Sequence, residues 1–103
     1  MAWYVYVAHF FAGIFLANCV PHFVQGISGR KFQSPFASPP GVGESSATVN
    51  VVWGFVNFVV AFLLLAGFGP FKFEISLDAL AVGLVMIVIS IILAGHFSHL
   101  HDK

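Results

Sequence analysis

Charged side chains are scarce in this sequence. Four Lys and Arg and four Asp and Glu make up 8% of its 103 residues and leave no net charge. Soluble domains carry roughly 25% charged residues, so this composition excludes an ordinary soluble globule. No basic excess is present either, and we therefore expect no nucleic-acid partner.

Cysteine is nearly absent as well. The single Cys19 excludes an internal disulfide and any CxxC metal or redox motif. Residues 16–19, Leu-Ala-Asn-Cys, are a poor match to a lipoprotein processing box, and no Lys or Arg precedes the apolar run. We therefore expect neither cleavage nor lipidation at this position.

Apolar residues dominate, at 59% of the chain, and 17% of the residues are aromatic. A membrane helix needs about 20 mostly apolar residues. Three stretches meet that requirement, at about residues 2–24, 49–68 and 77–95. We therefore predict an all-α integral membrane protein, a single membrane domain over residues 1–103 with three transmembrane helices in a lipid bilayer.

The two expected connections differ in length and composition. Segment 26–48 holds four glycines and three prolines, a composition that excludes a regular helix. This long Gly/Pro-rich loop carries Phe32 and Phe36, which favours either anchoring in the lipid headgroups or a lid over the helix ends. The short turn 69–75 predicts that the second and third helices are antiparallel neighbours.

Local signals predict where the helices bend or begin. Pro21 should kink the first helix or end its regular part. Ser76 can cap the third helix, with Asp78 in its first turn where the helix dipole favours a negative charge. Beyond the third helix we expect a His-rich tail over residues 96–103.

Lys and Arg set the expected orientation. Three helices place Arg30, Lys31 and Lys103 on one side of the membrane and Lys72 on the other. By the positive-inside rule, loop 26–48 and the C-terminus should be cytoplasmic, in a plasma (inner) membrane.

Helical spacing groups the few polar and small residues into stripes. The stripe on the second helix comprises Asn50, Trp53, Gly54, Asn57 and Ala61, and that on the third comprises Ala79, Gly83, Ser90 and Ala94. Small residues let membrane helices approach closely. Asn57, near the bilayer middle, should point at another helix, either in an interhelical hydrogen bond or as polar lining of a pore or pocket.

The first helix has polar residues on two faces. Asn18, His22 and Gln25 share one face, whereas His9 lies on the opposite one. We expect one face to meet the chain's own bundle and the other to meet a partner protein or a second copy.

Histidines are unusually numerous for so few charges. Four of the five should lie on one side of the membrane, namely His22, His96, His99 and His101. These four are a candidate transition-metal site. The alternatives are a pH-sensitive interface or a structural cluster favoured by the helix dipole. His9 and His22 are about 140° apart around the helix, so we expect no pair of haems, and no other cofactor is expected.

No catalytic constellation is evident. The four carboxylates are split between the two sides, and no nucleophile has a recognisable base beside it. We therefore expect no enzyme, but an accessory or structural subunit that packs against another membrane protein or against itself. One alternative is a homo-oligomeric channel or transporter for a small neutral solute, and another is a membrane protein that binds metal through its C-terminal histidines. The direction of Asn57 should discriminate between the structural and the transport functions.

Overall fold

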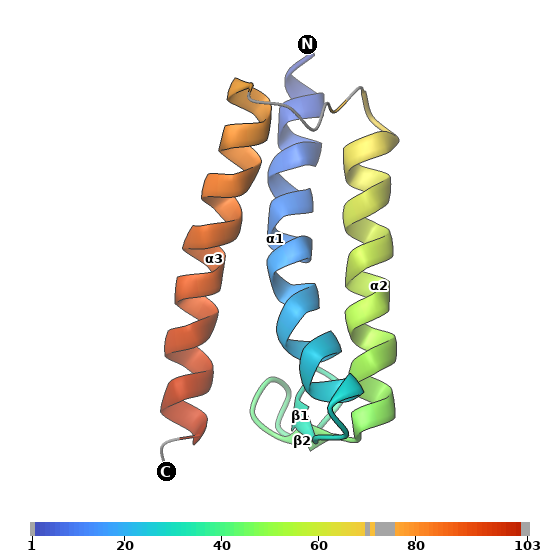
Figure 1. Cartoon of the computed structure of the whole chain (residues 1–103), viewed down its shortest axis with the longest axis vertical. Helices are drawn as coiled ribbons and strands as arrows, with labels where there is room; N and C mark the ends of the chain where they lie inside the picture. The colour runs from blue at the N-terminus through green and yellow to red at the C-terminus, as the bar shows by residue number, and fades with distance from the viewer. Residues whose placement is uncertain (1, 70, 72–75, 102–103) are drawn as a thin grey trace.

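The computed structural model describes residues 2–69, 71 and 76–101 and consists of three long helices and a small hairpin. The helices are α1 (Trp3–Ile27), α2 (Ala47–Ala66) and α3 (Leu77–His101), and the two-residue strands are β1 (Phe32–Gln33) and β2 (Glu44–Ser45). Helix α1 lies between α2 and α3 (Figure 1), in a molecule 44 Å long. Each helix is long and apolar enough to cross a membrane, as the sequence predicted.

Two helix ends differ from the prediction. Helix α1 reaches Ile27 with Pro21 inside it, so the proline does not end the helix, and the kink stays a prediction. Helix α3 passes Gly95 and reaches His101. The expected tail therefore forms the last turns of α3 as far as His101, whereas residues 102 and 103, like most of the expected turn 69–75, lie outside the described residues.

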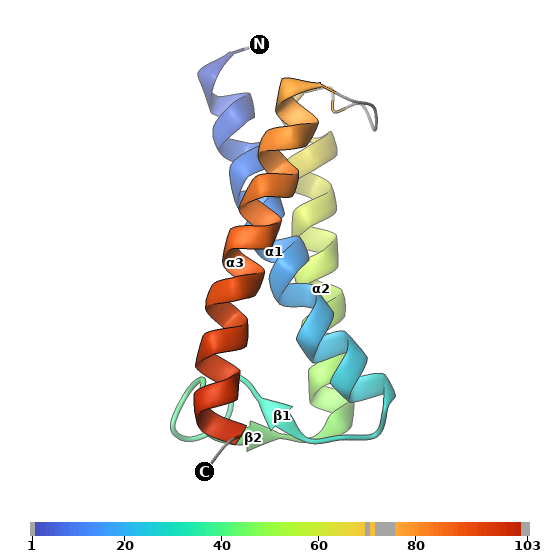
Figure 2. The same ribbon diagram turned by 60° about the vertical axis from the view of Figure 1, so that its left-hand side comes forward.

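The order of the helices also differs from the prediction. Helices α2 and α3 are antiparallel but are separated by α1, which contacts both (Figures 1 and 2). A small core of Ala12, Leu65 and Val82, one residue from each helix, lies at the end away from the hairpin. Small residues of α1 allow it to lie close to its neighbours. At Gly13, for example, a Cβ would lie only 3.1 Å from the carbonyl oxygen of Val82 on α3, so a larger residue would push the two helices apart.

Helices α1 and α2 approach closely at two glycines. A Cβ on Gly54 would lie 2.7 Å from the backbone nitrogen of Phe23, and one on Gly26 would lie 2.7 Å from that of Val51. The α2 stripe therefore faces α1. The α3 stripe is mostly exposed, and a Cβ on Gly83 would meet nothing within 4 Å.

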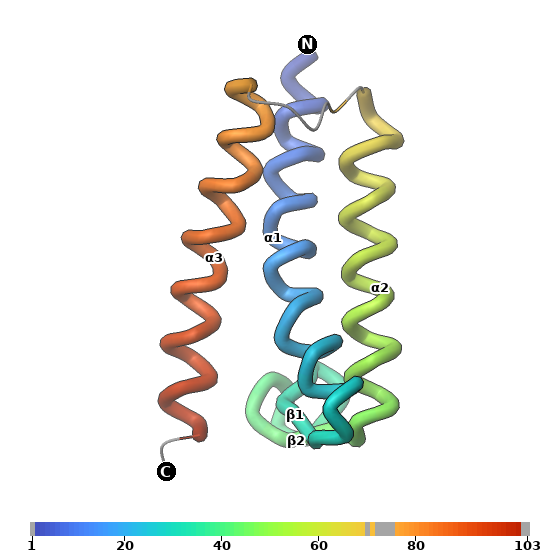
Figure 3. The backbone as a smooth tube through the Cα atoms, viewed as in Figure 1, coloured from blue at the N-terminus to red at the C-terminus, as the bar shows by residue number. Residues whose placement is uncertain are grey.

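The 26–48 segment folds across one end of the bundle (Figure 3). Strands β1 and β2 pair antiparallel, with Phe32 opposite Ser45. Phe32 is buried beneath the helix ends, whereas Phe36 is 65% exposed. We call residues 28–46, which lie over these helix ends, the lid. Phe32 lies on its inner side, and Phe36 lies on its surface.

Serine side chains cap the helices that follow the two connections. The Val49 amide donates to Ser46 Oγ at the start of α2. The Ala79 amide donates to Ser76 Oγ at 3.1 Å, which confirms the predicted cap of α3.

Replacing Gly54 by Ala tests the contact between α1 and α2. The added methyl group meets backbone atoms of α1, so we expect the free energy of unfolding to fall by about 1–3 kcal/mol. Gly83→Ala is the matched control in the dissociated single chain, because within one chain its methyl group meets nothing within 4 Å and should stabilise the helix by up to about 1 kcal/mol. Thermal unfolding in mild detergent measures both variants, and equal stabilities would contradict the close approach.

Candidate functional site

Polar side chains of α1 point inward at several levels of the bundle. His9 and His22 are buried, as are Asn50 and Asn57 of α2. A buried polar group needs a hydrogen-bond partner to offset its lost hydration. The partners of these side chains therefore define the polar interior of the protein.

Asn50 joins the hairpin to the helices at the lid end. Its side-chain nitrogen donates to the carbonyl oxygens of Phe32, Ser45 and Ser46, at 3.1, 3.2 and 3.0 Å. Since carbonyl oxygens only accept, these contacts determine which way the amide is turned. The amide oxygen then faces His22, whose Nδ1 lies 2.8 Å away.

This contact determines the tautomer of His22. The Asn50 oxygen only accepts, so Nδ1 of His22 carries the proton and donates it. In the neutral ring, Nε2 then holds a lone pair and finds no hydrogen-bond partner among the described residues. A histidine oriented in this way can accept a hydrogen bond, take up a proton or bind a metal.

Asn18 and Asn57 form a second polar link between α1 and α2. Asn18 Nδ2 donates to Asn57 Oδ1 at 3.0 Å, and Asn57 Nδ2 donates to the carbonyl oxygen of Trp53 at 2.8 Å. Asn57 is only 1% exposed. Its amide is therefore occupied by protein atoms inside the bundle.

The last turns of α3 hold the lid through histidines. His96 Nε2 lies 3.0 Å from the carbonyl oxygen of Gly41 and donates to it. His101 Nε2 lies 2.9 Å from Gln33 Oε1. The aromatic rings of Phe97 and Phe32 also pack against each other, tilted by 49° and with centroids 4.5 Å apart.

The predicted histidine set is not assembled into one site. His22, His96 and His101 lie at the lid end, but each bonds to a different group, and His99 is exposed. Within residues 2–69, 71 and 76–101, no three His, Cys, Asp or Glu side chains are grouped to hold one metal ion.

The buried His9 and the largely buried Asp78 form a pair that the sequence analysis missed. His9 Nδ1 lies 2.6 Å from Asp78 Oδ2, and Nε2 lies 3.2 Å from the carbonyl oxygen of Leu65. That carbonyl only accepts, so Nε2 carries a proton, and a further proton must lie between Nδ1 and the carboxyl group. One imidazole therefore links all three helices at the end opposite the lid.

A signal for this pair was present in the sequence. The three-helix topology places the start of the first helix and the start of the third at the same end. The helix dipole alone explains an aspartate in the first turn of the third helix, so Asp78 did not require a partner. His9 lies on the face opposite the other polar residues of the first helix, so helical spacing gave it no partner either. Only the packing of α3 on α1 brings the two side chains together.

Two hollows flank the lower part of α3. One lies among α1, α2, α3 and the lid, has a volume of about 220 Å³, and is lined by His22, Gln33, Trp53 and His96 among others. Trp53 Nε1, which is buried, is a side-chain donor without a hydrogen-bond partner among the described residues. Trp53 is one of the residues that line this hollow, but its Nε1 has almost no accessible surface and therefore offers no donor to a molecule in it.

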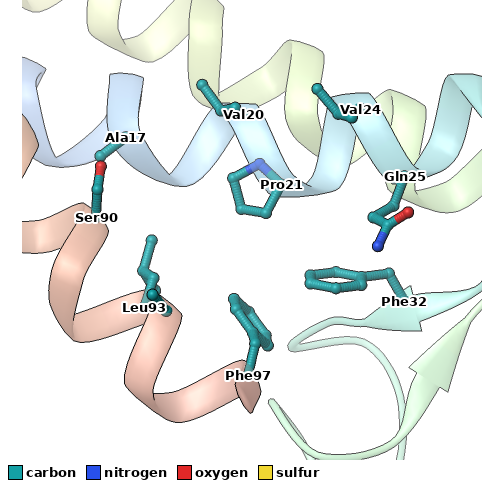
Figure 4. Close-up of a pocket in the computed structure, with 10 residues that line it drawn as sticks. Ala17, Val20, Pro21, Val24, Gln25, Phe32, Ser90, Leu93 and Phe97 are labelled. Atoms are coloured by element: carbon teal, nitrogen blue, oxygen red, sulfur yellow. The ribbon is translucent and has the colours of Figure 1, made fainter. Parts of the chain in front are cut away.

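The second hollow is an apolar groove of about 380 Å³ between α1 and α3. Figure 4 shows Val20, Pro21 and Val24 along one wall and Leu93 and Phe97 along the other. The Gln25 amide lies at one end and Ser90, the predicted polar residue of α3, at the other. Hydrocarbon chains suit such a surface better than polar molecules do.

Replacing Asp78 by Leu tests the buried pair. Without its partner, the buried Nδ1 of His9 is left unpaired, and we expect the free energy of unfolding to fall by about 3 kcal/mol. The double variant His9→Leu with Asp78→Leu should recover part of that loss, because both polar groups are removed together.

Glu44→Leu, which removes an exposed carboxylate at the other end, is the control and should change little. Chemical unfolding in detergent provides the comparison. Additive effects of the two substitutions at His9 and Asp78 would show that the side chains do not interact.

Comparison of the chain with protein-family models, with curated proteins and with solved structures gives no significant match. The function is therefore argued from the geometry of the chain itself.

Proposed function

We propose that this protein is a three-span integral membrane protein that serves as an accessory or structural subunit, packed against another membrane protein or a second copy. The observation that carries the proposal is the direction of Asn57. Its amide bonds to Asn18 of α1 and to the Trp53 carbonyl inside the bundle, and it is almost completely buried. A side chain committed in this way supports helix packing rather than the lining of a water-filled path.

The surface of the helices supports placement in a bilayer. Their exposed positions are occupied by large apolar side chains such as Phe10, Phe62 and Ile91. The main polar side chains of α1 and α2 instead bond inside the bundle. Lipid cannot satisfy polar atoms, so this distribution is the one that a membrane requires.

Charge supports the proposed orientation. Arg30 and Lys31 are exposed beside the hairpin. We propose that this end and the C-terminus face the cytoplasm, at the inner membrane. Phe36, exposed on the same lid, is then placed to reach the headgroup region.

Helix α3 is the proposed contact surface. Only 6% of an apolar 18-residue stretch of α3 is buried, whereas 33% of the corresponding stretch of α1 is buried. Gly83 and Gly95 leave its backbone open, with nothing within 4 Å of a Cβ at either position. Small residues on a membrane helix favour close contact with another helix. A neighbouring chain would cover this face.

Transport by a homo-oligomer is the second proposal. Three helices are too few to enclose a pathway within one chain, so copies would have to form it between them. Asn18, Asn50 and Asn57 already have partners within the chain. The transport proposal is supported less well for that reason.

Photocrosslinking distinguishes a contact surface from a lipid-facing one. A photoreactive residue replaces Leu84 on α3 or, as the matched control, Phe55 on α2, two positions that are similarly exposed. We expect the Leu84 position to form a protein adduct of one defined mass and the Phe55 position to form lipid adducts.

Native mass spectrometry from mild detergent then identifies the partner of the Leu84 position. A mass increment of one further 11.1 kDa chain indicates a second copy, and any other single increment indicates a foreign subunit. Lipid adducts at both positions would contradict the proposed contact surface.

A further inference from the structure

The apolar groove between α1 and α3 opens to the outside of the bundle near the lid (Figure 4). Val20 and Val24 line it and are nevertheless 54% and 49% exposed, so a molecule can enter from the side. Gln25 and Ser90 are the only polar residues among the described ones that line it. The groove therefore favours a hydrocarbon occupant.

The groove has the length of one bilayer leaflet. Its lining on α1 runs from Ala17 to Gln25, a distance over which an α-helix rises about 12 Å. The hydrocarbon of one leaflet is half of a core about 30 Å thick. The volume of about 380 Å³ is more than twice the roughly 150 Å³ that holds benzene. An extended acyl chain from the leaflet on the lid side therefore suits the groove in length and in chemistry.

Two cations lie where the groove meets the lid. The backbone nitrogen of Arg30 donates to the carbonyl oxygen of Gln25 at 3.0 Å, and Lys31 directly precedes Phe32. Gln25 and Phe32 both line the groove. Both cations are exposed, and neither forms an ion pair with a described residue. Glu44 is the only carboxylate of the lid, so two cations against one anion leave a net positive charge that attracts anionic headgroups.

We propose that this groove binds one acyl chain of an anionic phospholipid, whose phosphate group lies beside Arg30 and Lys31. The Gln25 amide can donate to the ester oxygens that join the acyl chain to the headgroup. Phe32 and Phe97 contact the acyl chain at the lid end of the groove. The proposal rests on the membrane placement proposed above, but not on the accessory role.

Native mass spectrometry of the full chain, released from lipid nanodiscs, tests the site. The nanodiscs contain equal amounts of phosphatidylglycerol and phosphatidylcholine with the same acyl chains, so that only the headgroup differs. We expect one retained lipid per chain. Phosphatidylglycerol should be retained at least about tenfold more often, because each cation near a membrane surface favours an anionic lipid by about fivefold.

Replacing both Arg30 and Lys31 by Gln tests the headgroup contact. Without the two cations, the ratio of retained phosphatidylglycerol to phosphatidylcholine should fall to about one. Lys72→Gln, which removes a cation from the other connection of the chain, is the control and should leave the ratio unchanged.

Val20→Trp fills the groove and tests the place of the acyl chain. The retained lipid of either kind should fall about tenfold, because the acyl chain loses its apolar contacts. Val88→Trp on α3 is the matched control. It adds the same volume at a position that is 47% exposed and does not line the groove, so lipid retention should not change. Circular dichroism shows whether both variants keep the helical content of the unaltered chain.

Three results would overturn the proposal. The first is equal retention of the two lipids by the unaltered chain. The second is a preference for phosphatidylglycerol that survives the loss of Arg30 and Lys31. The third is unchanged lipid retention in a folded Val20→Trp variant. Extraction of the chain from vesicles by alkaline carbonate would instead contradict the membrane placement itself, and the site with it, so the two failures are distinguishable.

Discussion

Hydrogen bonds from α1 to its neighbours determine how the rest of the molecule is arranged. His9 bonds to Asp78 of α3 and to the Leu65 carbonyl of α2, while Asn18 and His22 bond to asparagines of α2. In the bilayer that we propose for this chain, no water would satisfy these atoms, so separating the helices would leave each of them unpaired. Apolar contacts between helices would provide little drive there, which would give these few bonds a large share of the specificity.

The lid depends on one amide in the same way. Asn50 holds both strands of the hairpin by their carbonyl groups and turns its oxygen to His22. Asn50 thus sets the tautomer of His22 and ties both strands of the lid to α2. Because His96 and His101 hold the lid from α3, the end of the third helix takes part in the same unit.

Local properties of the sequence predicted the helices well. The three apolar stretches and the Ser76 cap depend on neighbouring residues alone. Asn57 was expected to face another helix because its amide is costly in lipid. The structure gives it Asn18 as the partner.

The misjudged features depend on contacts between distant segments. A short connection implies antiparallel helices but does not prevent α1 from lying between them, which small residues such as Gly13 permit. The sequence predicts the end of α3 at Gly95, whereas the helix reaches His101, where Phe97 and His101 contact the lid. The His9–Asp78 pair was missed for the same reason, since only the packing of α3 on α1 unites these residues.

Exchange of the side-chain amide protons of Asn57 with deuterated water tests the dry, bonded interior most directly. NMR of the unaltered chain in bicelles can follow these protons beside those of free asparagine in the same buffer. Our account predicts exchange at least about a hundredfold slower for Asn57, because its amide is buried and bonded to the Trp53 carbonyl. Exchange as fast as that of free asparagine would show that water reaches the middle of the bundle and would contradict the account in favour of a polar path.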